Sequence, residues 1–323
     1  MWHSRRARIL TATGAVLVVV VALVAIVLVR HQHGAPSGRP SATAPLRTSS
    51  VPAPQPGALA VKIDNVSGAR PQTGLSRAQV IYVEPVEAGL TRLVAVFTGP
   101  LPATVGPVRS ARETDLGLLA AWGHPVLAYS GAVPALVARL HAARWLVNAS
   151  DADVPRAYHR SGSRPAPHNL YVSPRLLPKG TGPSQPVLDV GAAPADGTPA
   201  TDRQVRFAAA RYDFHWSPAT GRWLVYLDGT PLTTTESGQL AAATVVLQQV
   251  RTVPGTYRED SSGNRAPIAQ TVGSGAVTVL RGGRAFTGTW SRPTTADPTR
   301  FRTANGSDLL LAGGPEWIVL VPG

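Results

Sequence analysis

Two arginines that bracket a serine are the residues of this chain whose type and spacing best suit anion binding. They end the run VGPVRSAR, residues 105–112, in which Gly-Pro restricts the backbone just before Arg109, Ser110 and Arg112. The run SARE within it fits a helix capping box, with Ser110 as the cap. Both guanidinium groups would then lie beside the unpaired amides of a helix start, where anions bind readily.

A second interpretation of this segment needs no ligand. Arg109 and Arg112 could instead pair with acids such as Glu113 and Asp115 on the surface. Ser110 at a helix start is compatible with a nucleophile in phosphoryl or acyl transfer, and equally with an ordinary helix cap.

A histidine on a stiff segment is the next candidate. In RSGSRPAPHNLY, residues 160–171, Pro165 and Pro167 restrict the backbone before His168 and Asn169. A histidine presented in this way can act as a general acid or base, or donate to an anion. Its ring could instead bond a backbone carbonyl and lock the loop.

Further polar candidates lie at the end of a strand and inside two others. Asp64 and Asn65 end the apolar strand in IDNVSGARPQTGL, and Arg70 occupies the following turn, so all three could reach a cleft. Glu84 and Arg92 each sit within an apolar strand, where an unpaired charge is costly. We expect an ion pair between them; the alternative is that Glu84 is a buried catalytic carboxylate.

The signatures of common enzyme classes are missing from the sequence. It contains no GxSxG, GxxxxGK or HExxH motif, and its eight histidines are scattered. There is no cysteine, which excludes a disulfide, a thiol nucleophile and lipidation. We therefore expect no metal site and no cofactor.

The elements that must position these residues follow from apolar runs bounded by glycine, proline or asparagine. Strands are expected at 59–64, 79–86, 91–98 and 125–130, with helices after Ser110 and at 134–143. From residue 203 onward short strands dominate. The sequence thus predicts an α+β protein with a mixed-sheet α/β-type domain at 58–179, a linker at 180–202 and a β-rich domain at 203–323.

A membrane anchor is expected before these domains. Residues 9–29 are 21 consecutive uncharged, mostly apolar residues, enough for a helix to cross a bilayer. Arginines are concentrated in the preceding tail, residues 1–8, so this end should be cytoplasmic and the rest of the chain extracellular. A cleaved signal peptide is the alternative. Residues 30–57 are rich in proline and predict a solvated tether.

The charge of the chain limits its partners. The formal net charge is +13, but residues 1–60 hold six arginines and no acid, which leaves the folded part with +7. Such a domain can attract anionic lipids or acidic wall polymers. Its extracellular position and the lack of basic runs with interleaved aromatics argue against nucleic acid.

Read together, these segments resemble the YerB-like lipoprotein family of bacteria, a domain of unknown function (DUF3048) with N-terminal and C-terminal parts. The resemblance rests on IDNVSGARPQTGLSRAQVIYVEPVEAGLTRLVAVF, VGPVRSAR, AYSG and APHNLY, and on GSGAVTVLRGGRAFTGTW and GPEWIVLVP near the end. It implies an exported two-domain α+β protein and supplies no activity. The lack of a cysteine departs from the lipoprotein pattern, so the helix would replace the lipid anchor. The family motif also includes Ser130.

Three functions remain open from the sequence. The first is a tethered module that binds an anionic envelope ligand through Asp64, Asn65, Arg70, Arg92, Arg109, Arg112, Ser130 and Asn169. The second is an envelope enzyme for phosphoryl or acyl transfer or hydrolysis, with His168, Ser110 or water, and Glu84 as catalytic groups. The third is a structural partner in an envelope protein complex.

Overall fold

The computed structural model describes residues 56–259 and 262–323. The predicted cytoplasmic tail, the membrane helix at 9–29 and nearly all of the tether at 30–57 lie outside this range. Among the described residues, no helix is both long and apolar enough to cross a membrane.

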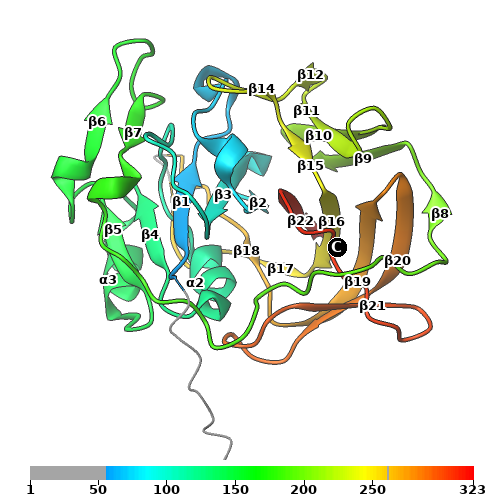
Figure 1. Ribbon diagram of the computed structural model, residues 1–323. Helices are drawn as coiled ribbons and strands as arrows, with labels where there is room; N and C mark the ends of the chain where they lie inside the picture. Colours follow the sequence, from blue (N-terminus) through cyan, green and yellow to red (C-terminus); the bar gives the residue numbers. More distant parts are fainter. Residues whose placement is uncertain (1–55, 260–261) are drawn as a thin grey trace, which may run out of the picture. The chain divides into compact units, whose positions relative to one another are not determined.

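One large mixed sheet runs through the described chain (Figure 1). Its strand order is β21 (Arg300–Thr303), β20 (Arg284–Arg292), β19 (Gly273–Arg281), β16 (Thr244–Val250), β22 (Glu316–Pro322), β2 (Val80–Pro85), β3 (Thr91–Phe97), β1 (Leu59–Ile63), β4 (Val126–Tyr129) and β5 (Val147–Ser150), with β8 (Thr198–Pro199) beside β20. The pairs β1–β4, β4–β5, β2–β22 and β16–β22 are parallel, and the other pairs are antiparallel. The last strand, β22, therefore joins strands from both halves of the sequence.

The central strands are apolar because both faces of the sheet are covered. Every residue of β1, β2 and β3 is buried. Alternate side chains enter two different cores, so Val61 and Ala60 face opposite sides. One core includes the helices α2 (Glu113–Leu119) and α3 (Pro134–Ala142).

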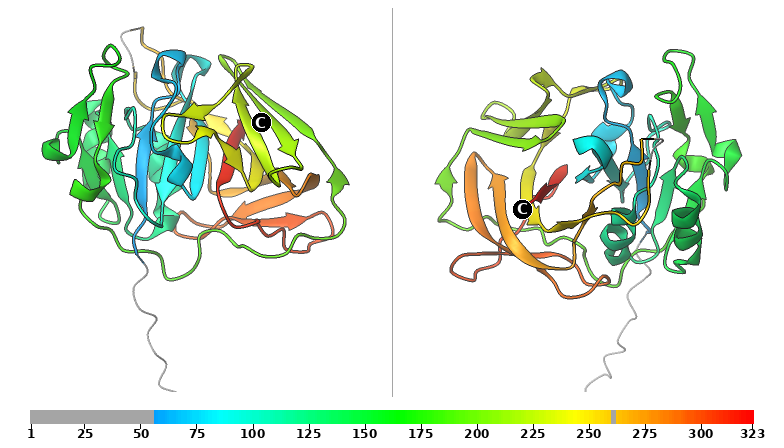
Figure 2. Two further views of the ribbon diagram at one scale, coloured as in Figure 1. Left: turned by 45° about the horizontal axis from the view of Figure 1, so that its top comes forward. Right: turned by 180° about the vertical axis from the view of Figure 1, so that it is seen from behind.

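The other core is closed by a second, five-stranded sheet. It consists of β12 (Thr230–Pro231), β11 (Arg222–Leu227), β10 (Ala210–Ser217), β9 (Asp202–Phe207) and β15 (Ala241–Ala242). The helices and this sheet lie well apart in all the views (Figures 1 and 2). The large sheet is therefore the middle layer, between the helices and the five-stranded sheet.

Shorter elements complete the fold. The two-stranded ladders are β6 (Tyr158–Arg160) with β7 (Leu170–Val172), β13 (Thr233–Thr234) with β14 (Gly238–Gln239), and β17 (Thr252–Val253) with β18 (Ile268–Ala269). Single 3-10 turns occur at Ser67–Ala69, Leu75–Arg77, Glu87–Gly89, Ala120–Trp122, Pro155–Ala157 and Pro174–Leu176.

The expected mixed sheet is confirmed, and the described residues form mostly strands with few helices. One local prediction was wrong. Helix α2 begins at Glu113 and its N-cap is Arg112, so Ser110 does not cap it. The Asp115 carboxylate accepts a hydrogen bond from the Arg112 backbone N–H at 2.7 Å, which supplies the capping contact from inside the first turn.

Candidate functional site

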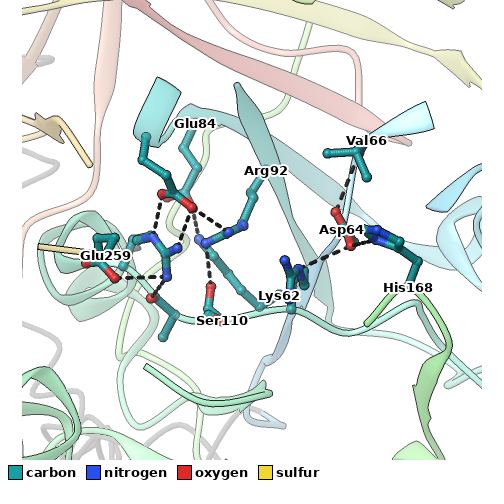
Figure 3. A network of polar contacts seen from close by, with 12 residues as sticks. Lys62, Asp64, Val66, Glu84, Arg92, Ser110, His168 and Glu259 are labelled. Atoms are coloured by element: carbon teal, nitrogen blue, oxygen red, sulfur yellow. Dashed lines mark hydrogen bonds and ion pairs between the residues drawn. The ribbon is translucent and has the colours of Figure 1, made fainter. Parts of the chain in front are cut away.

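Asp64 is the centre of the group of residues that could act on a ligand. It follows the last residue of β1, and its side chain is only 3% exposed. Its Oδ2 lies 2.7 Å from Nδ1 of His168 (Figure 3). The same oxygen lies 3.2 Å from Nε of Arg109. One buried carboxylate oxygen thus holds two side chains that arrive from distant parts of the sequence.

Backbone hydrogen bonds bring these segments together. The chain around Val108 runs antiparallel to the end of β1, since the Asp64 N–H donates to Pro107 and the Arg109 N–H donates to Lys62. On its other side, the Val108 N–H donates to the carbonyl of Leu170, next to the His168 loop. The GPVR segment is therefore held between β1 and the start of β7.

Gly106 makes this close approach possible. A Cβ at this position would lie 2.8 Å from the Tyr171 ring and 2.9 Å from the Leu170 carbonyl oxygen. Any side chain there would push β7 away and shift the His168 loop relative to Asp64.

The His168 loop is fixed by hydrogen bonds of its own. Arg164 donates to the carbonyls of Ala69 and Pro71, both at 2.6 Å. Asn169 donates to the carbonyls of Ser161 and Arg164. Asn169 therefore orders the loop, and it is His168 that the loop presents.

Two groups of atoms at this site remain free to meet a ligand. The His168 side chain is 25% exposed and that of Arg109 is 29% exposed. In the described part of the chain, Nε2 of His168 and the two terminal nitrogens of Arg109 form no hydrogen bond with the protein. The carboxylate of Asp64 orients both side chains while leaving these nitrogens available.

The other arginines expected at the site are enclosed by carboxylates. Arg112 donates to both oxygens of Glu87, at 2.8 and 2.6 Å, and its third nitrogen contacts the Ala111 carbonyl and Glu259. Arg92 donates to the same Glu87 at 2.8 Å. These arginine side chains are only 4% and 8% exposed, so their donors serve the protein itself.

The charges in this enclosed group shift one another's pKa values. Burial alone would raise the pKa of Glu87, but hydrogen bonds and charges from Arg112 and Arg92 lower it to about 2. Burial and the neighbouring Arg112 lower the pKa of Arg92 to about 10. Glu87 stays ionised over the physiological range and holds both guanidinium groups.

A third buried group surrounds Lys62 of β1. Its ammonium pairs with Glu84 and donates to Asp115 at 2.8 Å, and all three side chains are almost completely buried. Burial lowers the pKa of Lys62 to about 8, against the attraction of Asp115. The expected ion pair between Glu84 and Arg92 is thus replaced by Lys62–Glu84 and Arg92–Glu87, although Glu84 and Arg92 are register partners.

The remaining candidates lie around these groups. Arg70 pairs with Asp228 at 2.7 Å, and Asn65 donates to Thr91 and to the Tyr212 hydroxyl. Through Asp228 and Tyr212, these two residues connect the segment after β1 to the second half of the chain. Ser130 donates through its hydroxyl to Asp151 at 3.1 Å.

Ser110 lies in the chain between Arg109, which contacts Asp64, and Arg112, which contacts Glu87. Its carbonyl accepts from Arg92 at 3.3 Å, whereas its hydroxyl forms no hydrogen bond within the described residues. In the same residues no group of three or more histidine, aspartate or glutamate side chains has the geometry of a metal site.

Of the candidates named from the sequence, the structure places Arg109 and His168 at Asp64, whereas Arg70 and Arg112 pair with other carboxylates. The sequence interpretation missed most of the residues that pair with the remaining buried charges. Glu87 and Glu259, which pair with these arginines, were not singled out, and neither was Lys62, the partner of Glu84. Asp115 was expected to pair with an arginine, but its side chain pairs with Lys62. For Lys62 a signal existed, because a charge in the apolar run LAVKI needs a buried partner, as Glu84 does. Glu87 follows β2 directly and had no comparable signal.

Comparisons with known proteins agree with this architecture. Residues 45–185 match the family described as "Protein of unknown function (DUF3048) N-terminal domain", and residues 203–318 match its C-terminal domain. A curated protein of Bacillus subtilis (strain 168), "Putative lipoprotein YerB", is 36% identical over 116 residues. That match covers 36% of this chain and only about a third (34%) of the relative's length.

A crystal structure of the YerB protein from Bacillus subtilis shares the fold. Its TM-score is 0.68 at 21% identity, with 83% of this chain and 92% of that chain covered. The likeness extends through both matched domains and supports one common architecture.

Proposed function

We propose a function from the premise that this chain belongs to the DUF3048 family of YerB-like proteins: it is an envelope protein that binds an anionic ligand at Asp64, Arg109 and His168. The ligand class is a phosphate or carboxylate of a cell-envelope compound. A phosphorylated lipid carrier, a teichoic-type polymer and a peptidoglycan stem all carry such groups.

The family and the sequence both support the proposed location. The B. subtilis relative is titled a lipoprotein, and this chain has no cysteine to carry a lipid. We infer that the apolar run at 9–29 takes the place of the lipid as a single-pass anchor in the plasma membrane. The arginines before it place the N-terminus in the cytoplasm and the folded domains outside.

The observation that carries the proposal is the shared oxygen of Asp64. Because this oxygen contacts both Nδ1 of His168 and Nε of Arg109, the remaining nitrogens of both side chains are oriented and uncommitted. An anionic oxygen can accept hydrogen bonds from Arg109 and, when the imidazole is protonated, from His168. Arg112 and Arg92 contribute positive potential at most, since Glu87 occupies their donors.

The test measures thermal stability of the full chain in detergent with inorganic phosphate, poly(glycerol phosphate) and a muropeptide. A ligand at about 100 times its dissociation constant should stabilise the protein by about 2.7 kcal/mol and raise its melting temperature by several degrees. The shift should vanish in Arg109→Ala and persist in Arg203→Ala, which removes an exposed arginine of β9. Equal shifts in both variants, or none with any compound, would refute the site.

A second function is favoured by one specific contact. With Nδ1 of His168 held by Asp64, Nε2 can accept a proton from a water molecule, as a general base requires. Ser110, whose hydroxyl forms no hydrogen bond within the described residues, is the other candidate nucleophile. Arg109 would then stabilise the charge that develops on a phosphoryl or acyl oxygen. Glu84 is sealed in its pair with Lys62 and does not serve this chemistry.

Catalysis and binding are separated by one comparison. For hydrolysis, His168→Gln should abolish product release from a phosphoester while ligand-induced stabilisation through Arg109 persists. Ser110→Ala then distinguishes the nucleophiles, because loss of turnover implicates the serine and retained turnover implicates water.

A further inference from the structure

An apolar surface lies where the chain enters the described fold, away from the residues of the anion site. Two cavities of about 560 and 410 Å³ share Pro56, Ala58 and Thr98 in their walls. The larger one is lined mainly by apolar side chains, which include Leu59, Phe97, Leu101, Val126 and Leu177.

Two exposed leucines lie at or next to the larger cavity. Leu101, at the larger cavity, is 42% exposed, and Leu176, in the neighbouring 3-10 turn, is 47% exposed. Within the described part of the chain only four large hydrophobic residues are exposed to this degree, and these are two of them. Exposed apolar side chains gathered beside cavities indicate a surface that is covered by a partner.

The charges beside the leucines are positive and unpaired. Arg175 and Lys179 line the larger cavity, and Arg156 lines a third cavity next to Leu176. All three are exposed, and none has an ion-pair partner in the described residues. The acid that faces this side is Asp153, which is already engaged by Ser150 and His141. The partner should therefore be anionic.

The position of the surface in the chain indicates which partner. Pro56 bridges to Thr181 and lines both cavities, so the segment that carries the predicted anchor joins the fold here. A coil of about 25 residues, as in the predicted tether, has a root-mean-square length of roughly 30 Å, which keeps this end of the fold near the bilayer. Effective concentration then favours contact even when the intrinsic affinity is low.

We infer that the surface formed by Leu101, Leu176, Arg156, Arg175 and Lys179 docks on the anionic phospholipid face of the membrane. Leucine side chains enter the headgroup region, and the cations attract anionic lipids. Docking would fix the orientation of the fold on the bilayer. This inference goes beyond the proposed anion site, which shares no residue with the surface.

The chain contains no cysteine, so single labels can test this in the full-length protein. Leu176→Cys and, as a reference, Ala219→Cys in the turn between β10 and β11 would each carry an environment-sensitive fluorophore. Both proteins would be reconstituted in phosphatidylcholine vesicles with or without phosphatidylglycerol, with doxyl-labelled lipid as the quencher. We expect quenching at position 176 to exceed that at position 219 several-fold, and only with phosphatidylglycerol.

Charge reversal supplies the control. Arg175→Glu with Lys179→Glu should reduce quenching at position 176 to the level at 219, whereas Arg203→Glu with Arg206→Glu, the same charge change on β9, should not. Equal quenching at both positions, or quenching unaffected by the first pair, would overturn the inference. Protection of position 176 from aqueous iodide without lipid quenching would also overturn it, since a protein partner would then cover the surface.

Discussion

Asp64 and Glu87 each hold two cationic side chains, yet they leave those side chains in different states. Asp64 contacts Arg109 and His168, which are both about a quarter exposed and keep free nitrogens. Glu87 contacts Arg92 and Arg112, which are buried and keep none for a ligand. At the residue scale, the exposure of the arginine side chain itself decides whether its nitrogens can reach a ligand or serve only the fold.

The Glu87 carboxylate should stabilise the fold in a pH-dependent manner. Its pKa in the folded protein, about 2, is below the ordinary value of 4.5. The stabilisation is therefore complete above about pH 4.5 and is lost progressively as the pH falls from there through about 2. Glu87→Gln should therefore lower the free energy of unfolding by about 3 kcal/mol at neutral pH. Urea unfolding from pH 7 to pH 2.5 should show this difference shrink.

The control for Glu87 is an exposed acid. Asp308→Asn breaks an ion pair with Arg302 in which both side chains are at least 60% exposed, and should cost under about 1 kcal/mol. A deficit in Glu87→Gln that stays constant down to pH 2.5 would show that its effect is one of packing rather than charge.

At the scale of elements, the segment before α2 is extended and hydrogen-bonded between β1 and β7, and it does not cap the helix. Ser110 lies in this segment, and the helix starts at Glu113 with Asp115 bonded to the Arg112 N–H. Two strand-like hydrogen bonds therefore set the position of Arg109. Its own N–H donates to the Lys62 carbonyl, and the N–H of its neighbour Val108 donates to the Leu170 carbonyl. Its orientation owes little to the helix dipole.

Ser110→Ala tests this arrangement. Loss of a helix cap typically costs about 1 kcal/mol, whereas a serine that caps nothing should change the free energy of unfolding by less than about 0.5 kcal/mol. Asp115→Ala is the matched variant, because it removes both the capping contact and a partner of buried Lys62 and should cost about 3 kcal/mol or more. Equal losses in chemical denaturation would restore Ser110 as the cap.

At the scale of the whole molecule, β22 connects the two halves that the sequence suggests as domains. It pairs in parallel with β16 on one side and β2 on the other, and its residues Ile318 and Val319 enter opposite cores. Strand β22 is therefore the link through which the strands of both halves form one sheet.

We therefore expect residues 56–323 to unfold in a single transition. In hydrogen exchange at increasing urea, peptides from β1–β3 and from β19–β20 should become exchangeable at the same midpoint, because both depend on β22. Removal of residues 316–323 should destabilise both groups of peptides together. Separate midpoints in the intact chain would mean that the halves are energetically independent.

The sequence by itself determined the local elements. Apolar runs between glycine and proline located β1 to β4 and α3, and period-two alternation places Ala60, Lys62 and Asp64 on one side of β1. These signals arise within a few residues of chain, where backbone preferences and side-chain spacing act directly. The same local information identified Asp64, Arg109 and His168 as candidates.

Only the tertiary structure decided which charges meet. Glu84 and Arg92 are opposite each other in register, yet they do not pair with each other. Glu84 pairs with Lys62, because β1 lies next to β3 in the sheet. Arg92 pairs with Glu87, which also contacts Arg112. Strand order and turn position depend on contacts between residues far apart in sequence. Burial depends on them as well, and burial separates the exposed Arg109 from the enclosed Arg112.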